Sequence, residues 1–160
     1  MQIPEPGDAH RRLHAMAGTW AGEETIHPAS WDPAGGRADV RIWNRLALNG
    51  LVLVQDYEQA RGGGAPVFTG HGVLRWDDEA REYVFHWFDS VRTAPGEFRG
   101  SWEGDTLTLL RSGAPGWARA RYDFAGDRYT WRMDVSGDGE QWLPYLEGTY
   151  TREPDGDQRP

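Results

Sequence analysis

The chain has 160 residues, which suit one domain with a core large enough to fold without covalent cross-links. It contains no cysteine, so disulfides, thiolate metal sites and cysteine nucleophiles are excluded. All 17 basic residues are arginine, which excludes lysine chemistry, and the net charge of −8 argues against nucleic-acid and anionic-membrane partners.

The N-terminal segment has neither the apolar run of a signal peptide nor a membrane-spanning stretch, so we expect a cytoplasmic protein. A short helix is predicted over residues 9–17, with Asp8 as its cap. His10 and His14 lie four apart on this helix, a spacing that can chelate zinc. Arg11 replaces the glutamate of the metalloprotease motif, so we interpret the pair as a solvated face and expect no metal site.

From residue 20 onward, short β-type runs alternate with glycine-rich or acidic turns. Asn49-Gly50 is the strongest hairpin signal. No helix separates the runs, which excludes a parallel sheet. We therefore predict an all-β fold, an antiparallel up-and-down barrel of about ten strands with one N-terminal helix, and keep a sandwich as the alternative. One domain is expected over 1–152 and a disordered tail over 153–160. The expected strands are 20–27, 37–48, 51–59, 67–76, 81–90, 97–103, 106–111, 116–124, 128–135 and 141–152.

Period-two alternation in the predicted hairpin of 67–90 indicates which face points inward. The inner face of the last strand stays open, because Leu146 and Tyr150 compete with Tyr145 for it. Phe88 faces outward and needs cover from the helix or a partner, which leaves a homodimer open. The residues expected on the inner face are Phe68, Gly70, Gly72, Leu74, Trp76, Tyr83, Phe85, Trp87, Tyr129, Trp131 and Met133.

Asp89 is the candidate catalytic residue, because it places a carboxylate at the end of an apolar face. As a structural group it would accept backbone N–H bonds from residues 90–96, or pair with Arg119 or Arg121. As a functional group it would orient a ligand or act as a general base. We interpret both arginines as outward-facing; an inward one would clamp a ligand carboxylate. The segment 134–140 is interpreted as a hairpin turn rather than a calcium loop.

Five stretches resemble a known family: PGDAHRRLHAMAGTW, LALNGLVLVQDYE, GHGVLRWD, YVFHWFDS and YLEGTYTR. It is the domain-of-unknown-function family numbered 1579, a group of small bacterial proteins placed with lipocalin-like (calycin) barrels. The resemblance covers nearly the whole chain and implies the barrel, but no reaction. In calycins a Gly-x-Trp of the first strand packs against an arginine of the last. Gly18-Thr19-Trp20 and Arg152 match by type, so we interpret Trp20 and Arg152 as structural.

A weaker resemblance is to nitrobindin-type haem barrels, where an inward methionine is followed by a loop and a Pro-His whose histidine binds the iron. Met133 matches, but Pro144-Tyr145 stands where Pro-His would. Tyrosine can ligate haem iron, so the resemblance keeps haem open as a cofactor.

The predicted function is binding of a small hydrophobic or aromatic molecule, largely apolar or planar, inside the barrel. One alternative is a barrel enzyme in which Asp89 does acid/base chemistry with Tyr57, Tyr145 or an arginine. The other is a haem barrel with Tyr145 as iron ligand. A filled barrel without a cavity would exclude all three. The predicted ligand-contacting residues are Tyr57, Phe68, Phe85, Trp87, Asp89, Tyr122, Trp131, Met133 and Tyr145.

Overall fold

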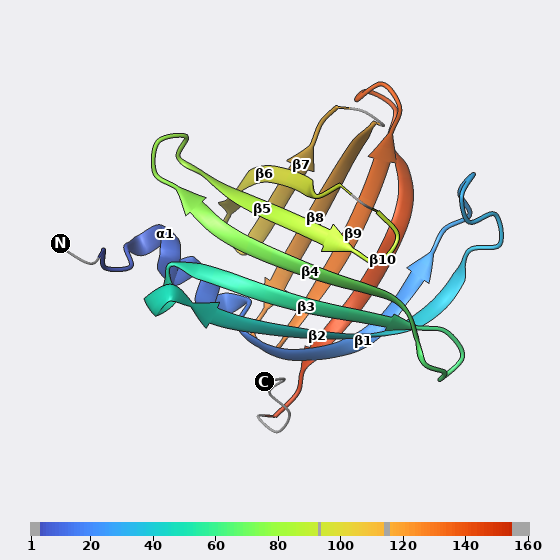
Figure 1. Ribbon diagram of the computed structural model, residues 1–160, viewed down its shortest axis with the longest axis horizontal. Helices are drawn as coiled ribbons and strands as arrows, with labels where there is room; N and C mark the ends of the chain where they lie inside the picture. The colour runs from blue at the N-terminus through green and yellow to red at the C-terminus, as the bar shows by residue number, and fades with distance from the viewer. Residues whose placement is uncertain (1–3, 93, 114–115, 155–160) are drawn as a thin grey trace.

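The computed structural model describes residues 4–92, 94–113 and 116–154, so most of the predicted disordered tail lies outside the described residues. Ten antiparallel strands follow a short helical segment and close into one barrel (Figure 1). Each strand pairs with its neighbours in sequence, and the last strand returns to pair with the first. The predicted barrel is confirmed, and the sandwich alternative is wrong.

The elements are α1 (Asp8–Arg11), the 3-10 helix η1 (Arg12–Ala15), β1 (Gly18–Ile26), β2 (Gly36–Ala47), the 3-10 turn η2 (Leu48–Gly50), β3 (Val52–Ala60), β4 (Pro66–Asp77), β5 (Glu82–Asp89), β6 (Gly96–Glu103), β7 (Thr106–Arg111), β8 (Trp117–Ala125), β9 (Arg128–Ser136) and β10 (Leu143–Arg152). Every predicted strand is present, with its ends shifted by at most one or two residues.

Two local expectations need correction. The helix is shorter than predicted and its cap is Gly7, because the Asp8 side chain binds the Arg11 guanidinium instead of the helix end. The β2–β3 connection is longer than a two-residue Asn-Gly turn, because Leu48 also adopts a left-handed φ of 50° before Asn49 at 59°.

The helical segment covers one end of the barrel. Leu13 and Trp20 are fully buried there, and the Trp20 indole N–H donates to the Met16 carbonyl at 2.8 Å. The Arg152 guanidinium lies over the Trp20 ring at 4.2 Å and donates to the Ala17 carbonyl. The structural pairing of Trp20 with Arg152 is therefore confirmed. It ties the first strand to the last.

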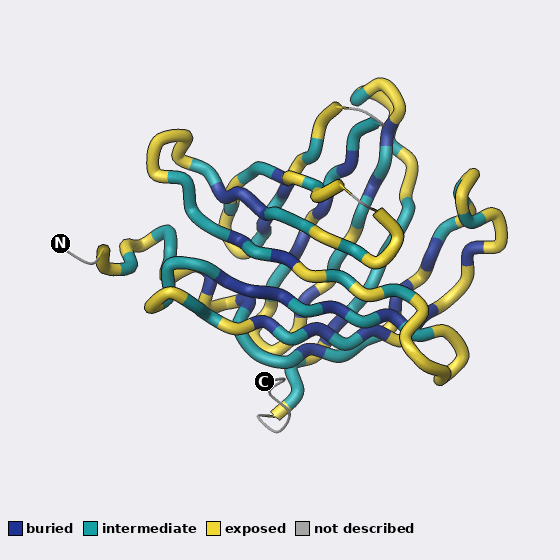
Figure 2. Tube along the Cα trace, in the orientation of Figure 1, coloured by how far each residue is buried: buried dark blue, intermediate teal, exposed yellow. Residues whose placement is uncertain are grey.

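Buried and exposed positions alternate along the strands (Figure 2), as the predicted faces require. Arg119 and Arg121 point outward, where they pair with Asp134 and Asp123 at 3.0 Å each. Trp43 also faces outward, and the Arg41 guanidinium covers its ring at 5.3 Å. Phe88 stays 49% exposed, so the helix does not cover it.

Candidate ligand-binding interior

The helical segment covers one end of the barrel, whereas no described helix covers the opposite end, which is termed the open end. Near the helix, Leu13, Leu53 and Leu107 are at most 1% exposed. The loops after β1 and β3 project from the opposite end (Figure 1). Toward that end, several side chains packed against the core remain partly exposed: Phe68, Trp87, Trp131, Met133 and Val135. The inner-face side chains toward this end are therefore not fully enclosed by the protein.

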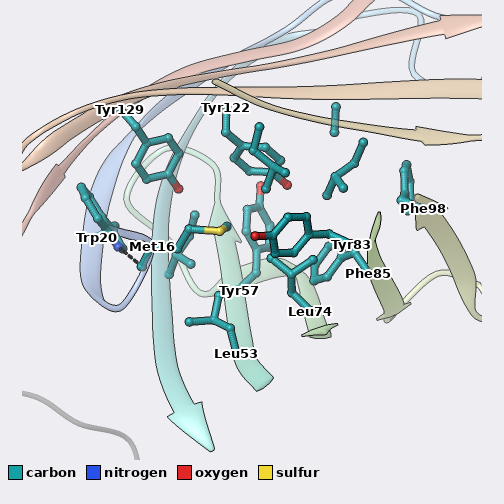
Figure 3. Close-up of a cluster of buried hydrophobic side chains, with 14 of the residues drawn as sticks. Met16, Trp20, Leu53, Tyr57, Leu74, Tyr83, Phe85, Phe98, Tyr122 and Tyr129 are labelled. Carbon is teal, nitrogen blue, oxygen red and sulfur yellow. Dashed lines mark hydrogen bonds between the residues drawn. The ribbon is translucent and has the colours of Figure 1, made fainter. Parts of the chain in front are cut away.

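Aromatic rings line this interior from two sides, with Tyr57 and Phe85 facing Tyr122 and Tyr129 (Figure 3). Tyr57 on β3 meets Phe68 at 5.8 Å and Trp87 at 5.9 Å, both edge-on. On the facing wall, Tyr122 of β8 packs against Trp131 of β9 at 6.2 Å. The structure thus brings most of the predicted ligand-contacting residues to one interior, including Phe85 and Met133.

The two inward glycines of β4 do not leave empty space. A Cβ atom at Gly70 would overlap the Trp87 ring, and one at Gly72 would overlap the Phe85 ring. The rings of β5 therefore lie flat across the backbone of β4. The neighbouring aromatic side chains occupy the space that the two glycines leave.

Asp89 is held by its own surroundings at the open end. Its carboxylate accepts the Trp87 indole N–H at 3.1 Å and the backbone N–H groups of Val91 and Arg92 at 3.0 and 2.9 Å. The expected bonds to the following loop are confirmed. The expected pairing with Arg119 or Arg121 is wrong, because both arginines lie on the outer face.

Tyr145 lies apart from the other predicted site residues. It stands at an irregularity in the β10–β9 pairing between Pro144 and Leu146, and its ring packs edge-on against Trp31 at 5.3 Å. Tyr150 is the tyrosine of β10 that enters the core, being 1% exposed. This answers the question that the sequence left open about the last strand.

A buried carboxyl in the interior escaped the sequence analysis. Glu24 of β1 is fully buried, and it accepts hydrogen bonds from the Tyr57 hydroxyl at 2.7 Å and the Gln59 amide at 2.8 Å. The Tyr150 hydroxyl donates to its other oxygen. Three side chains from two other strands thus converge on one carboxyl.

Burial raises the pKa of Glu24, and the hydrogen bonds from Tyr150, Tyr57 and Gln59 oppose that rise. Burial and the neighbouring Glu24 raise the pKa of Tyr57 well above its ordinary value. When Glu24 holds a proton, its O–H must donate to a tyrosine hydroxyl, which frees that hydroxyl's own hydrogen for another acceptor. The cluster can therefore hold one proton within the barrel.

The rim of the open end carries several exposed apolar side chains. Seven large apolar side chains are exposed within the described ranges. Four of them stand on or beside the loops of the open end: Trp31, Val67, Val91 and Leu143. Apolar side chains at the rim beside an aromatic interior suit the entry of an apolar molecule.

A shallow open groove of about 610 Å³ lies on the outer wall over β8, β9, β10 and β1. Its outward side chains already pair with one another, as Arg121 does with Asp123 and Arg132 with Glu147. Because these groups are paired and solvated, we place the candidate site in the interior. In the part of the chain that the structure describes, no cluster of three or more histidine or acidic side chains is arranged to hold a metal ion.

A family model described as "Protein of unknown function (DUF1579)" matches residues 5–152. A search of curated proteins gives no match. The crystal structure of Rv2717c from M. tuberculosis is similar, with a TM-score of 0.71 and 16% identity over 94% of this chain and 100% of that one. At this sequence identity, the similarity between the two structures shows a shared fold and nothing more. None of the helices described here is both long and apolar enough to cross a membrane.

Proposed function

This chain belongs to the DUF1579 family, and from its barrel we propose that it binds one small, largely apolar or planar molecule in the interior. One observation carries the proposal: inward-facing aromatic side chains that pack against the core, Trp87 and Trp131 among them, are only partly buried. Apolar area removed from water contributes about 25 cal/mol per Å², so a flat molecule stacked among these rings would gain affinity.

A polar group within the same wall supports one defined orientation of the ligand. The indole N–H of Trp131 is buried and meets no hydrogen-bond partner among the described residues. The Tyr122 hydroxyl lies near this N–H but outside hydrogen-bonding geometry. A buried donor without an acceptor costs about 1–3 kcal/mol, which an acceptor on the ligand would recover.

The test is a titration with N-phenyl-1-naphthylamine, a neutral aromatic probe that fluoresces in apolar surroundings. We expect saturable binding of one molecule, with energy transfer from tryptophan. Val135→Trp adds a large ring to the inner face of β9 toward the open end, where it would occupy space needed by the ligand. It should weaken binding about tenfold or more, which corresponds to about 1.4 kcal/mol or more. Thr130→Trp adds the same ring to the outer face of the same strand and should leave binding within about twofold. Absence of saturable binding, or equal binding by both variants, would overturn the proposal.

A further inference from the structure

We propose that the interior ligand is an anion, and that Arg111 binds its carboxylate or sulfonate at the open end. This inference rests on the proposed function and specifies the chemical class of the ligand. The aromatic or apolar body of the ligand would lie among the rings of the interior, and its one negative group would lie at the open end.

Arg111 is the cation on the inner face of β7. Leu107 and Leu109 precede it on the same face of the strand and are at most 1% exposed. Its guanidinium lies over the Phe98 ring at 5.5 Å, and a Cβ atom at Gly96 would stand 3.9 Å from its side chain. The side chain thus runs along the inner wall at the open end, partly buried between β6 and β7.

The Arg111 guanidinium has donors to spare. It makes no hydrogen bond or ion pair with any residue that the structure describes, although a guanidinium carries five N–H donors. Outward arginines of the neighbouring strands are satisfied: Arg99 binds Glu82 at 2.8 Å and Glu97 at 2.7 Å. Burial lowers the pKa of Arg111, and the nearby Arg92 lowers it further. An anion at this point would supply the missing acceptor and counter-charge.

Asp89 does not fill that role. It is the acid that acts on Arg111 at a distance, but its oxygens are already bound by the Trp87 indole and by two backbone N–H groups. Those bonds also fix the backbone of Arg92 at the rim. The charged groups that act on Arg111 are the Arg92 guanidinium and the Asp89 carboxylate, so the immediate surroundings carry a positive excess on a chain whose net charge is −8.

The matching ligand has a flat apolar body and a single anionic group. Arginine binds carboxylates and sulfonates through two parallel N–H bonds, and a neutral molecule of the same shape would leave these donors unsatisfied. The negative charge of the whole chain repels anions at long range, so recognition must come from the short-range contact with Arg111.

The experiment compares two probes that share one aromatic frame, 1-anilinonaphthalene-8-sulfonate and the neutral N-phenyl-1-naphthylamine, on the full chain. Arg111→Met keeps an apolar stem but removes the guanidinium. We expect it to weaken binding of the sulfonate about tenfold more than binding of the neutral probe. Arg111→Lys should fall between, because an ammonium keeps the charge and loses the paired donors. Arg128→Met, an exposed position of β9, should change neither.

The outcomes separate the two proposals. If the neutral probe binds and Arg111→Met leaves the sulfonate unaffected, the anion anchor is overturned and the binding function stands. Equal weakening of both probes by Arg111→Met also overturns the anchor, because it indicates a change in the pocket's shape. If neither probe binds saturably to the unmodified protein, the proposed binding function itself is overturned. Circular dichroism and the midpoint of thermal unfolding establish that each variant is folded.

Discussion

The Tyr150 hydroxyl on β10 donates a hydrogen bond to the buried carboxyl of Glu24 on β1, across the seam where the last strand meets the first. Tyr57 and Gln59 reach the same carboxyl from β3. One acidic side chain therefore joins three strands inside the barrel, and its partners are hydroxyls and an amide rather than a cation. Its protonation is linked to folding.

We predict that Glu24 makes the protein less stable as the pH rises. Its ordinary pKa is 4.5 and burial raises that value in the folded state. Below pH 4.5 both states hold the proton, whereas above it only the folded state does, so stability falls until the raised pKa is passed. For one proton the slope is at most about 1.4 kcal/mol per pH unit.

Glu24→Gln isolates this effect, because the amide resembles the protonated carboxyl and does not titrate. Urea unfolding of both proteins at several pH values from about 4.5 to 8 gives the difference in their free energies of unfolding. That difference should move in favour of the glutamine variant as the pH rises. A difference that is flat, or that moves the other way, would show that Glu24 is ionised in the folded protein throughout.

Removal of one tyrosine hydroxyl should separate this cluster from the rest of the core. Tyr150→Phe leaves a buried carboxyl oxygen without its donor and should cost about 1–3 kcal/mol at neutral pH. Tyr129 stacks on Tyr150 at 4.7 Å and is 2% exposed, but its hydroxyl makes no hydrogen bond within the described ranges. Tyr129→Phe is therefore the matched control, expected to lie within about 0.5 kcal/mol of the unmodified protein. If urea unfolding showed equal losses of unfolding free energy for the two variants, the hydrogen bond from Tyr150 to Glu24 would add no stability of its own.

The fold was predictable because strand alternation and turn residues are local signals. Tyr83, Phe85 and Trp87 recur at every second position of β5 and so share one face of the strand, and a one-residue shift of register would have moved all three rings to the other face. Trp20 and Arg152 could be paired only through the family resemblance, since nothing in their separation along the chain brings them together.

Glu24 was not predictable for a physical reason. It follows Glu23, and an acidic residue in a strand is ordinarily assigned to water. Glu23 does face outward and binds Arg37, whereas Glu24 turns inward, where its partners come from strands distant in sequence. Arg111 presents the same difficulty. Its inward position follows because it shares one face of the strand with Leu107 and Leu109, but its lack of a hydrogen-bond acceptor depends on how the open end of the barrel folds.

The seal at the helix end should depend on Arg152. Arg152→Met removes the cation over Trp20, the bond to Asp127 at 2.9 Å and the donors to the carbonyls of Ala15 and Ala17. We expect a loss of about 2–4 kcal/mol, since two carbonyls lose their donors and the indole loses its cation. Arg128→Met serves as the control at an exposed site. Thermal unfolding that is unchanged by Arg152→Met would show that the helix closes the end without it.

The close fit of β5 against β4 gives a last prediction, at Gly72. A Cβ there would overlap the Phe85 ring and approach the Trp87 ring at 3.2 Å. Phe85 is 7% exposed and cannot swing into solvent, so Gly72→Ala should cost about 1–3 kcal/mol through overpacking. Displacement of Trp87 should also shift its fluorescence and weaken binding of an aromatic probe.

Gly137 supplies the comparison, because a Cβ at that glycine meets nothing within 4 Å and its backbone needs no left-handed φ. Gly137→Ala should therefore be neutral or slightly stabilising, through the reduced freedom of the unfolded chain. If Gly72→Ala were equally neutral in urea unfolding and left the tryptophan emission unchanged, the two rings would have to lie away from β4. The interior would then be roomier than described here, and the ligand could reach the strand itself.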